Sequence, residues 1–128
     1  MSYKPTWDAA ASLRRFFVTG VSLNSALTDV GSFTGLPAKY RVVRLMGYDA
    51  SVSLTLATLD LRTATGGGGT AIVAAYAMAG LTAASKFVDA TLAVTADYQT
   101  ASTLTLRNVT AQGAAATATF CLEIMELT

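Results

Sequence analysis

Apolar residues at every second position dominate the chain from residue 51 onward. The longest example runs from 116 to 124, where the alternate positions are Ala116, Ala118, Phe120, Leu122 and Ile124. Successive side chains of a β-strand point to opposite faces, so this pattern predicts a strand with one face in a core and the other toward something more polar. The same pattern predicts strands over 51–56, 59–62, 88–95 and 103–107.

Other segments favour strands by composition. Residues 13–19 and 40–46 are rich in aromatic and branched side chains, which suit a pleated surface. The apolar phase changes between 51–56 and 59–62, which predicts a β-bulge near Ala57 and Thr58. Residues 70–78 contain enough alanine for a helix, but we favour a strand through Tyr76, and 81–86 is compatible with one helical turn. Breakers such as Val30-Gly31-Ser32 separate these segments.

The chain is long enough for one domain with a core, at 128 residues and 52% hydrophobic composition. We expect a single β-sandwich over 13–128, preceded by an N-terminal arm over 1–12. Tyr3 and Trp7 lie in the arm, where large rings either join the first strand or dock on a neighbouring molecule. Four consecutive glycines, 66–69, predict a loop at the end of a sheet, and their spacing matches no phosphate-binding motif.

Several function classes are disfavoured by what the chain lacks. It has no histidine and one cysteine, Cys121, so neither a disulfide nor the usual zinc and proton-transfer sites are expected. A net charge of +1 offers little attraction to nucleic acid, and no apolar run reaches the ~18 residues of a membrane span. No export signal is recognised, which predicts synthesis in the cytoplasm. We expect no catalytic site, no cofactor and no metal; a glycoside hydrolase would need two carboxylates facing across a cleft.

Charges are sparse, and this favours assembly. Charged residues make up 13% of the chain, about half of the ~25% typical of soluble proteins. The positions opposite the apolar set in 88–95 and 114–123 are mostly threonine, alanine and serine, which are easy to desolvate against another subunit. We therefore expect a homo-oligomer, a dimer or a trimer. Asp60 and Arg62 should form an ion pair on a solvated or interfacial strand face.

Basic and aromatic residues supply the candidate interface. On a regular strand Lys39 and Arg41 share one face while Arg44 points the other way, so no continuous basic stripe is expected. Arginine is enriched at protein interfaces because its planar head pairs with carboxylates. The candidate interface residues are Tyr3, Trp7, Arg14, Arg15, Lys39, Arg41 and Arg44.

Six segments together resemble small virion proteins of tailed bacteriophages, over roughly residues 30–127. They are 35–42 (GLPAKYRV), 53–57 (SLTLA), 61–64 (LRTA), the glycine run, and 104–107 with 114–120. The chain is similar in particular to capsid decoration, or cement, proteins with a jelly-roll β-sandwich. This resemblance implies a jelly-roll-like sandwich of about eight strands with no enzymatic activity. It also implies a place on the outer surface of the capsid, where the protein would bridge major capsid protein subunits and stabilise the shell.

A different function remains open. A β-sandwich module of a phage tail or fibre would bind a host carbohydrate, and sugar sites usually combine exposed aromatic rings with carboxylates or amides. The segments that offer this combination are Trp7, Tyr48-Asp49 and Asp97-Tyr98-Gln99.

Overall fold

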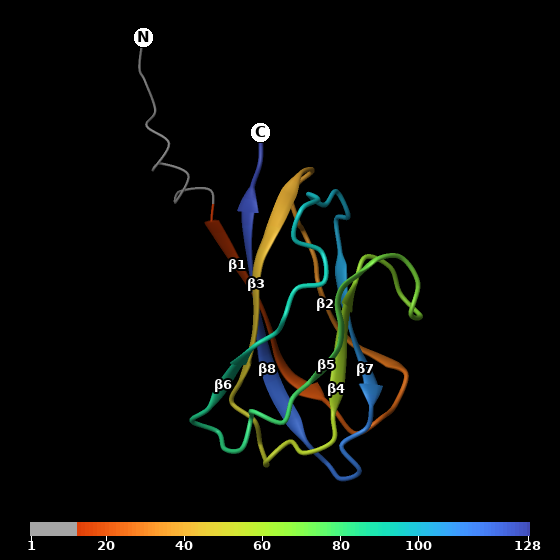
Figure 1. Ribbon diagram of the computed structural model, residues 1–128, viewed down its shortest axis with the longest axis vertical. Helices are drawn as coiled ribbons and strands as arrows, with labels where there is room; N and C mark the ends of the chain where they lie inside the picture. The colour runs from red at the N-terminus through yellow and green to blue at the C-terminus, as the bar shows by residue number, and fades with distance from the viewer. Residues whose placement is uncertain (1–12) are drawn as a thin grey trace.

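Two four-stranded antiparallel sheets make up the fold in a computed structural model that describes residues 13–128 (Figure 1). No helix is present within that range, and so none that could cross a membrane. Sheet A contains, in spatial order, β1 (Leu13–Ser22), β8 (Thr117–Glu126), β3 (Tyr40–Tyr48) and β6 (Phe87–Asp89). Sheet B contains β2 (Thr28–Phe33), β7 (Leu104–Thr110), β4 (Thr58–Arg62) and β5 (Ala71–Ala77).

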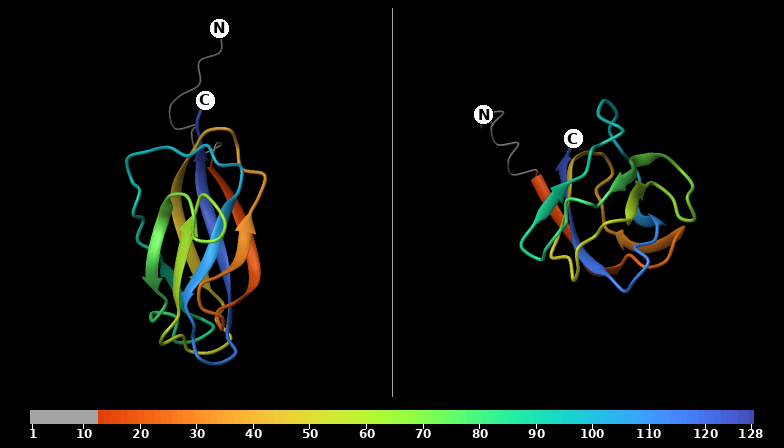
Figure 2. Two further views of the ribbon diagram at one scale, coloured as in Figure 1. Left: turned by 90° about the vertical axis from the view of Figure 1, so that its right-hand side faces the viewer. Right: turned by 60° about the horizontal axis from the view of Figure 1, so that its bottom comes forward.

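The strand order is that of a jelly roll. Strands β1 and β8, β2 and β7, β3 and β6, and β4 and β5 pair antiparallel, as if one long hairpin had been folded over. Pairing of β8 with β3 and of β7 with β4 then closes the two sheets, which wrap around each other in Figure 2. The expected all-β sandwich of about eight strands with jelly-roll-like topology is therefore confirmed.

This topology sorts the loops to two ends of the molecule. The β1–β2, β3–β4, β5–β6 and β7–β8 connections lie at the lower end in Figure 1, and the β2–β3, β4–β5 and β6–β7 connections lie with the C-terminus at the upper end. Between the sheets the alternate residues of the strands form one core. Its largest fully buried side chains include Phe33, Tyr40, Leu45, Leu59, Leu61, Ile72, Leu104 and Phe120.

The strand expected over 51–56 is wrong, because β4 begins only at Thr58. Leu54 is buried as the alternation requires, but Leu56 is 59% exposed. The amide side chain of Gln112 replaces a neighbouring strand: its Oε1 accepts hydrogen bonds from the backbone N–H groups of Thr55, Leu56 and Ala57. A register shift does occur between Thr58 and Leu59, next to the predicted bulge, but it does not join two strand segments.

The strand expected over 88–95 is much shorter in the structure, where β6 covers only Phe87–Asp89. The Ala90 N–H still donates to the Leu45 carbonyl of sheet A at 2.9 Å, but the Ala93 N–H donates to the Ile72 carbonyl of sheet B at 2.7 Å. The segment thus crosses from one sheet to the other instead of continuing along sheet A. Its outward residues do not form the flat strand face that the sequence predicts.

Strand β2 was not expected, because Gly31 reads as a breaker. It lies in the strand, and a Cβ atom there would come within 2.9 Å of Val18 Cγ1, so glycine permits the close approach of β1 and β2. The strand at 71–77 is confirmed, and the glycine run lies in the β4–β5 hairpin loop as predicted. Residues 81–86 form no helix, although the Lys86 N–H closes a turn on the Ala83 carbonyl.

Candidate interaction surface

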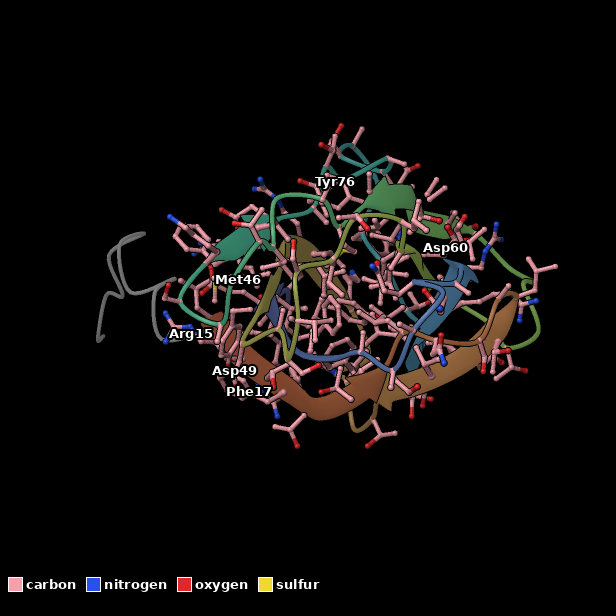
Figure 3. The ribbon with its side chains drawn as sticks, turned by 90° about the horizontal axis from the view of Figure 1, so that it is seen from below. Arg15, Phe17, Met46, Asp49, Asp60 and Tyr76 are labelled. Atoms are coloured by element: carbon pink, nitrogen blue, oxygen red, sulfur yellow. The ribbon has the colours of Figure 1, made fainter. Side chains whose placement is uncertain are left out.

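All four strands of sheet A contribute side chains to its outer face. Strand register places Phe17, Cys121 and Met46 side by side across β1, β8 and β3, and it places Thr119, Tyr48 and Phe87 in the next row. Figure 3 shows Arg15, Phe17 and Met46 together on this side of the molecule. We call this surface the sheet A face, and its residues are Arg15, Phe17, Arg44, Met46, Tyr48, Phe87, Asp89, Thr119, Cys121 and Glu123.

Large aromatic rings stand at both edges of the sheet A face. Phe17 on β1 is 57% exposed and Phe87 on β6 is 59% exposed. Between them Cys121 and Thr119 point outward from the central strand but are buried by their neighbours. Burial raises the pKa of the Cys121 thiol, because desolvation disfavours the thiolate, and the residue packs as a small apolar group. Exposed rings grouped around small, shielded residues are typical of a surface that other proteins cover.

Four charges of alternating sign cross the same face. In the order of the strands they are Arg15, Glu123, Arg44 and Asp89. Arg15 Nε lies 2.9 Å from Glu123 Oε2, and Arg44 binds both carboxylate oxygens of Asp89, at 2.5 and 3.1 Å. The pKa of Arg44 is raised, first by the hydrogen bond to Asp89 and also by the charge of Glu123. The Glu123 side chain is only 16% exposed, whereas the Arg15 side chain is 66% exposed.

The outer face of sheet B carries an ion pair that also holds the glycine-rich loop. Arg107 Nη1 lies 3.0 Å from Asp29 Oδ1, and the other Asp29 oxygen accepts the Gly66 N–H at 2.8 Å. The Gly66 N–H is the main reason that the pKa of Asp29 is lowered; Arg107 lowers it further, against the opposing effect of burial. The glycine-rich loop therefore lies against sheet B and is bound to it.

The predicted ion pair of Asp60 and Arg62 is present, with Arg62 Nε 2.8 Å from Asp60 Oδ2. Of the two expected settings, a solvated or an interfacial face, the solvated one is wrong, because Asp60 is only 5% exposed. The second Asp60 oxygen accepts the N–H of Ala75, which has a positive φ of 43° at an irregularity of β5. Asp60 thus stabilises the backbone of an edge strand.

Three of the predicted interface residues lie on the outer side of sheet A. Arg15 and Arg44 belong to the sheet A face, and Arg41 points to the same side of the sheet. The expectation that Arg41 and Arg44 lie on opposite faces is wrong, because a register shift between Val42 and Arg44 inserts one residue. Tyr3 and Trp7, with the whole predicted arm, lie outside the described residues.

Arg14 and Lys39 are engaged elsewhere. Arg14 Nη1 lies 3.5 Å from Glu126 Oε1, and the guanidinium stands 5.2 Å from the centre of the Phe16 ring. The Lys39 ammonium stands 5.1 Å from the centre of the Tyr98 ring. Other residues of the sheet A face, notably Phe17, Met46 and Phe87, are not among the sequence candidates. Phe17 could have been predicted from the sequence, because it lies two residues after Arg15 on a strand and therefore points to the same face.

A surface cavity of about 180 Å³ opens at the upper end of the sandwich. It is lined by Arg41, Thr95, Ala96, Asp97, Tyr98 and Leu127. Two of the residues expected at a carbohydrate site, Asp97 and Tyr98, thus come together with an arginine. The third, Gln99, is paired with Tyr40 through backbone hydrogen bonds of 2.7 and 3.0 Å. Tyr48 and Asp49 lie at the opposite end of β3 and do not join this cavity.

Metal-binding groups do not gather in the described part of the chain: residues 13–128 hold no cluster of three or more histidine, cysteine, aspartate or glutamate side chains. Comparison of the chain with protein-family models, with curated proteins and with solved structures found no significant match.

Proposed function

We propose that this chain is a non-enzymatic structural protein of a virion, which decorates the outer surface of a tailed-phage capsid and bridges major capsid protein subunits. The sheet A face is the observation that carries the proposal. Sheet B binds the glycine-rich loop through Asp29, while sheet A leaves Phe17 and Phe87 exposed to water. Jelly rolls are common among viral capsid proteins, which adds support by analogy of fold.

The mechanism of stabilisation is linkage. A protein that binds the assembled lattice and not the free capsid subunits stabilises the lattice by ~2.7 kcal/mol per site at a hundredfold excess over Kd. Many equivalent sites on a shell multiply this effect. Rigid β-sandwiches lose little conformational entropy on docking, which leaves more of the contact energy for association.

Purified particles test this proposal directly. The chain should be present in a fixed ratio of about one copy to a few copies of the shell protein, measured by quantitative mass spectrometry. Phe17→Ser combined with Phe87→Ser should reduce occupancy of shells that lack the protein. Leu56→Ser is the matched control, because Leu56 is equally exposed but lies in a loop at the lower end. Absence of the chain from particles, or full occupancy by the double variant, would contradict the proposal.

A second candidate function, binding of a host carbohydrate by a tail or fibre module, is favoured by the cavity at the upper end. Asp97 supplies acceptors for sugar hydroxyl groups and Arg41 supplies donors. Tyr98 is 54% exposed, so the side of its ring away from the Lys39 ammonium can stack against a sugar. Titration with host glycans should then shift the Tyr98 ring resonances saturably in NMR spectra. Tyr98→Ala should abolish the response, with Leu56→Ser as control. A flat titration with every glycan would reject this function.

A further inference from the structure

We propose that the occupant of the sheet A face is a second copy of this chain, related to the first by a two-fold axis that runs parallel to the strands. The inference rests on the proposed function only in taking the sheet A face as the docking surface. The dimer would then meet the shell through other surfaces, and the Phe17 and Phe87 substitutions would lower shell occupancy by removing the avidity of the dimer.

The order of the four charges carries the argument. A two-fold axis along the strands, in the plane between two packed copies, places β1 of one copy over β6 of the other and β8 over β3. Glu123 then directly faces Arg44 of the second copy, and Arg15 lies diagonally from Asp89 of the second copy, because Asp89 is paired with Met46, two residues further along the strands than Arg44. The two direct contacts and the two diagonal ones all join opposite charges, because the order of signs across the four strands is self-complementary under this rotation.

The aromatic edges fit the same arrangement. Phe17 stands on β1 and Phe87 on β6, at opposite edges of the sheet, so the rotation brings each ring over the other edge of the second copy. The middle of the interface is formed by Cys121, Met46 and Thr119, which are short or flexible. Two twisted sheets can therefore pack face to face here, as the two layers of a sandwich do.

The area of the sheet A face sets the strength of the contact. Four strands ~4.8 Å apart and ~8 residues long at ~3.4 Å per residue cover roughly 500 Å² of flat surface. Projecting side chains add to this, but specific stable interfaces use ~800 Å² per partner. We therefore expect a dimer in the micromolar range, which a crowded shell surface would populate fully.

Charge reversal separates contacts between copies from contacts within one copy. Glu123→Arg and Arg44→Glu should each weaken the homodimer at least ~10-fold, because each places like charges opposite one another twice. Mixing the two variants restores four opposite-charge contacts in the heterodimer. Analytical ultracentrifugation should show each variant as a monomer alone and a dimer in the mixture. Asp97→Arg, the same change of charge in the β6–β7 loop, should leave dimerisation unchanged.

A second pair of charge-reversal variants keeps the test valid if either of the first two variants does not fold. Arg15→Glu and Asp89→Arg obey the same rule, and circular dichroism identifies which variants are folded. The inference is overturned if the wild-type chain stays monomeric up to millimolar concentration, or if folded complementary variants do not associate on mixing. In that case a fixed ratio of the chain to shell protein in particles would leave the proposed function standing. Dimerisation with rescue, in a protein absent from particles, would reject the proposed function alone.

Discussion

Replacing Gln112 by methionine should destabilise the sandwich strongly, although Gln112 lies in a loop. Its Oε1 atom accepts three backbone N–H groups, from Thr55, Leu56 and Ala57, at 3.1, 3.0 and 3.1 Å. Its Nε2 atom donates to Thr55 Oγ1 at 3.1 Å. Methionine has a similar length and fills the same space, so the change removes these hydrogen bonds with little change in packing.

The expected loss follows from the burial of the three donors. Ala57 is buried, and an unpaired buried N–H costs ~1–3 kcal/mol. Thr55 and Leu56 are exposed residues whose N–H groups water can reach, so each contributes only ~0.5–1 kcal/mol. The sum is about 3 kcal/mol, which corresponds to a fall in Tm of roughly 10 °C for a domain of this size.

Urea unfolding followed by circular dichroism measures this loss, and Gln112→Glu is the matched control. The carboxylate keeps the acceptor for the three N–H groups, so this variant should lose less stability than Gln112→Met at neutral pH. A loss below ~0.5 kcal/mol for Gln112→Met would refute the reasoning, because it would mean that water replaces the amide without cost.

Three further outcomes are expected. Gly69→Ala should lower the free energy of unfolding more than Gly35→Ala. Both glycines have a positive φ, which costs an alanine ~1–2 kcal/mol, but only at Gly69 would the added Cβ atom also clash, 2.9 Å from the Ala64 nitrogen. Equal losses of stability in urea unfolding would contradict this. Asp29→Asn should be less stable than the wild type at neutral pH, and the difference in stability should vanish in acid. The lowered pKa of Asp29 confers stability that is lost as the pH falls below 3.8, the usual pKa of an aspartate. A stability difference that did not depend on pH would count against this reasoning. Burial raises the pKa of Tyr40 to about 12, so one tyrosine should resist ionisation in absorbance titrations, and the stability that Tyr40 confers should be lost as the pH rises from 10 towards 12. Tyr40→Phe should remove that late ionisation step. If the late step persisted in this variant, it would belong to another tyrosine.

The strands at 104–110 and 117–126 follow from the sequence because they are paired on both sides. Each lies inside its sheet, so the alternation of Leu104 and Leu106, or of Phe120 and Leu122, is enforced by the core. Residues 51–56 show the same alternation without a partner strand, and there Gln112 satisfies the backbone instead. Apolar periodicity reports which side chains are buried, but not what satisfies the N–H groups between them.

The sheet A face could be predicted only in part. Arg15 and Arg44 were accessible as candidates from their residue type, but their placement on one surface depends on the pairing of β1 and β3 with β8. The inserted residue at Val43 then turns Arg44 to the same side as Arg41. Asp89 was on the polar side of the alternation over 88–95, but the sequence does not show that this short strand lies beside β3 at the edge of sheet A.

By itself the sequence determined that this chain forms β-strands around one apolar core, because period-two alternation and the absence of long charged runs are local properties. Only the tertiary structure decided which strands are neighbours, and hence that the charges of four strands alternate in sign across one face with two exposed rings. Pairings between residues about a hundred positions apart, such as Arg15 with Glu123, depend on the closure of the jelly roll and leave no mark in the local pattern.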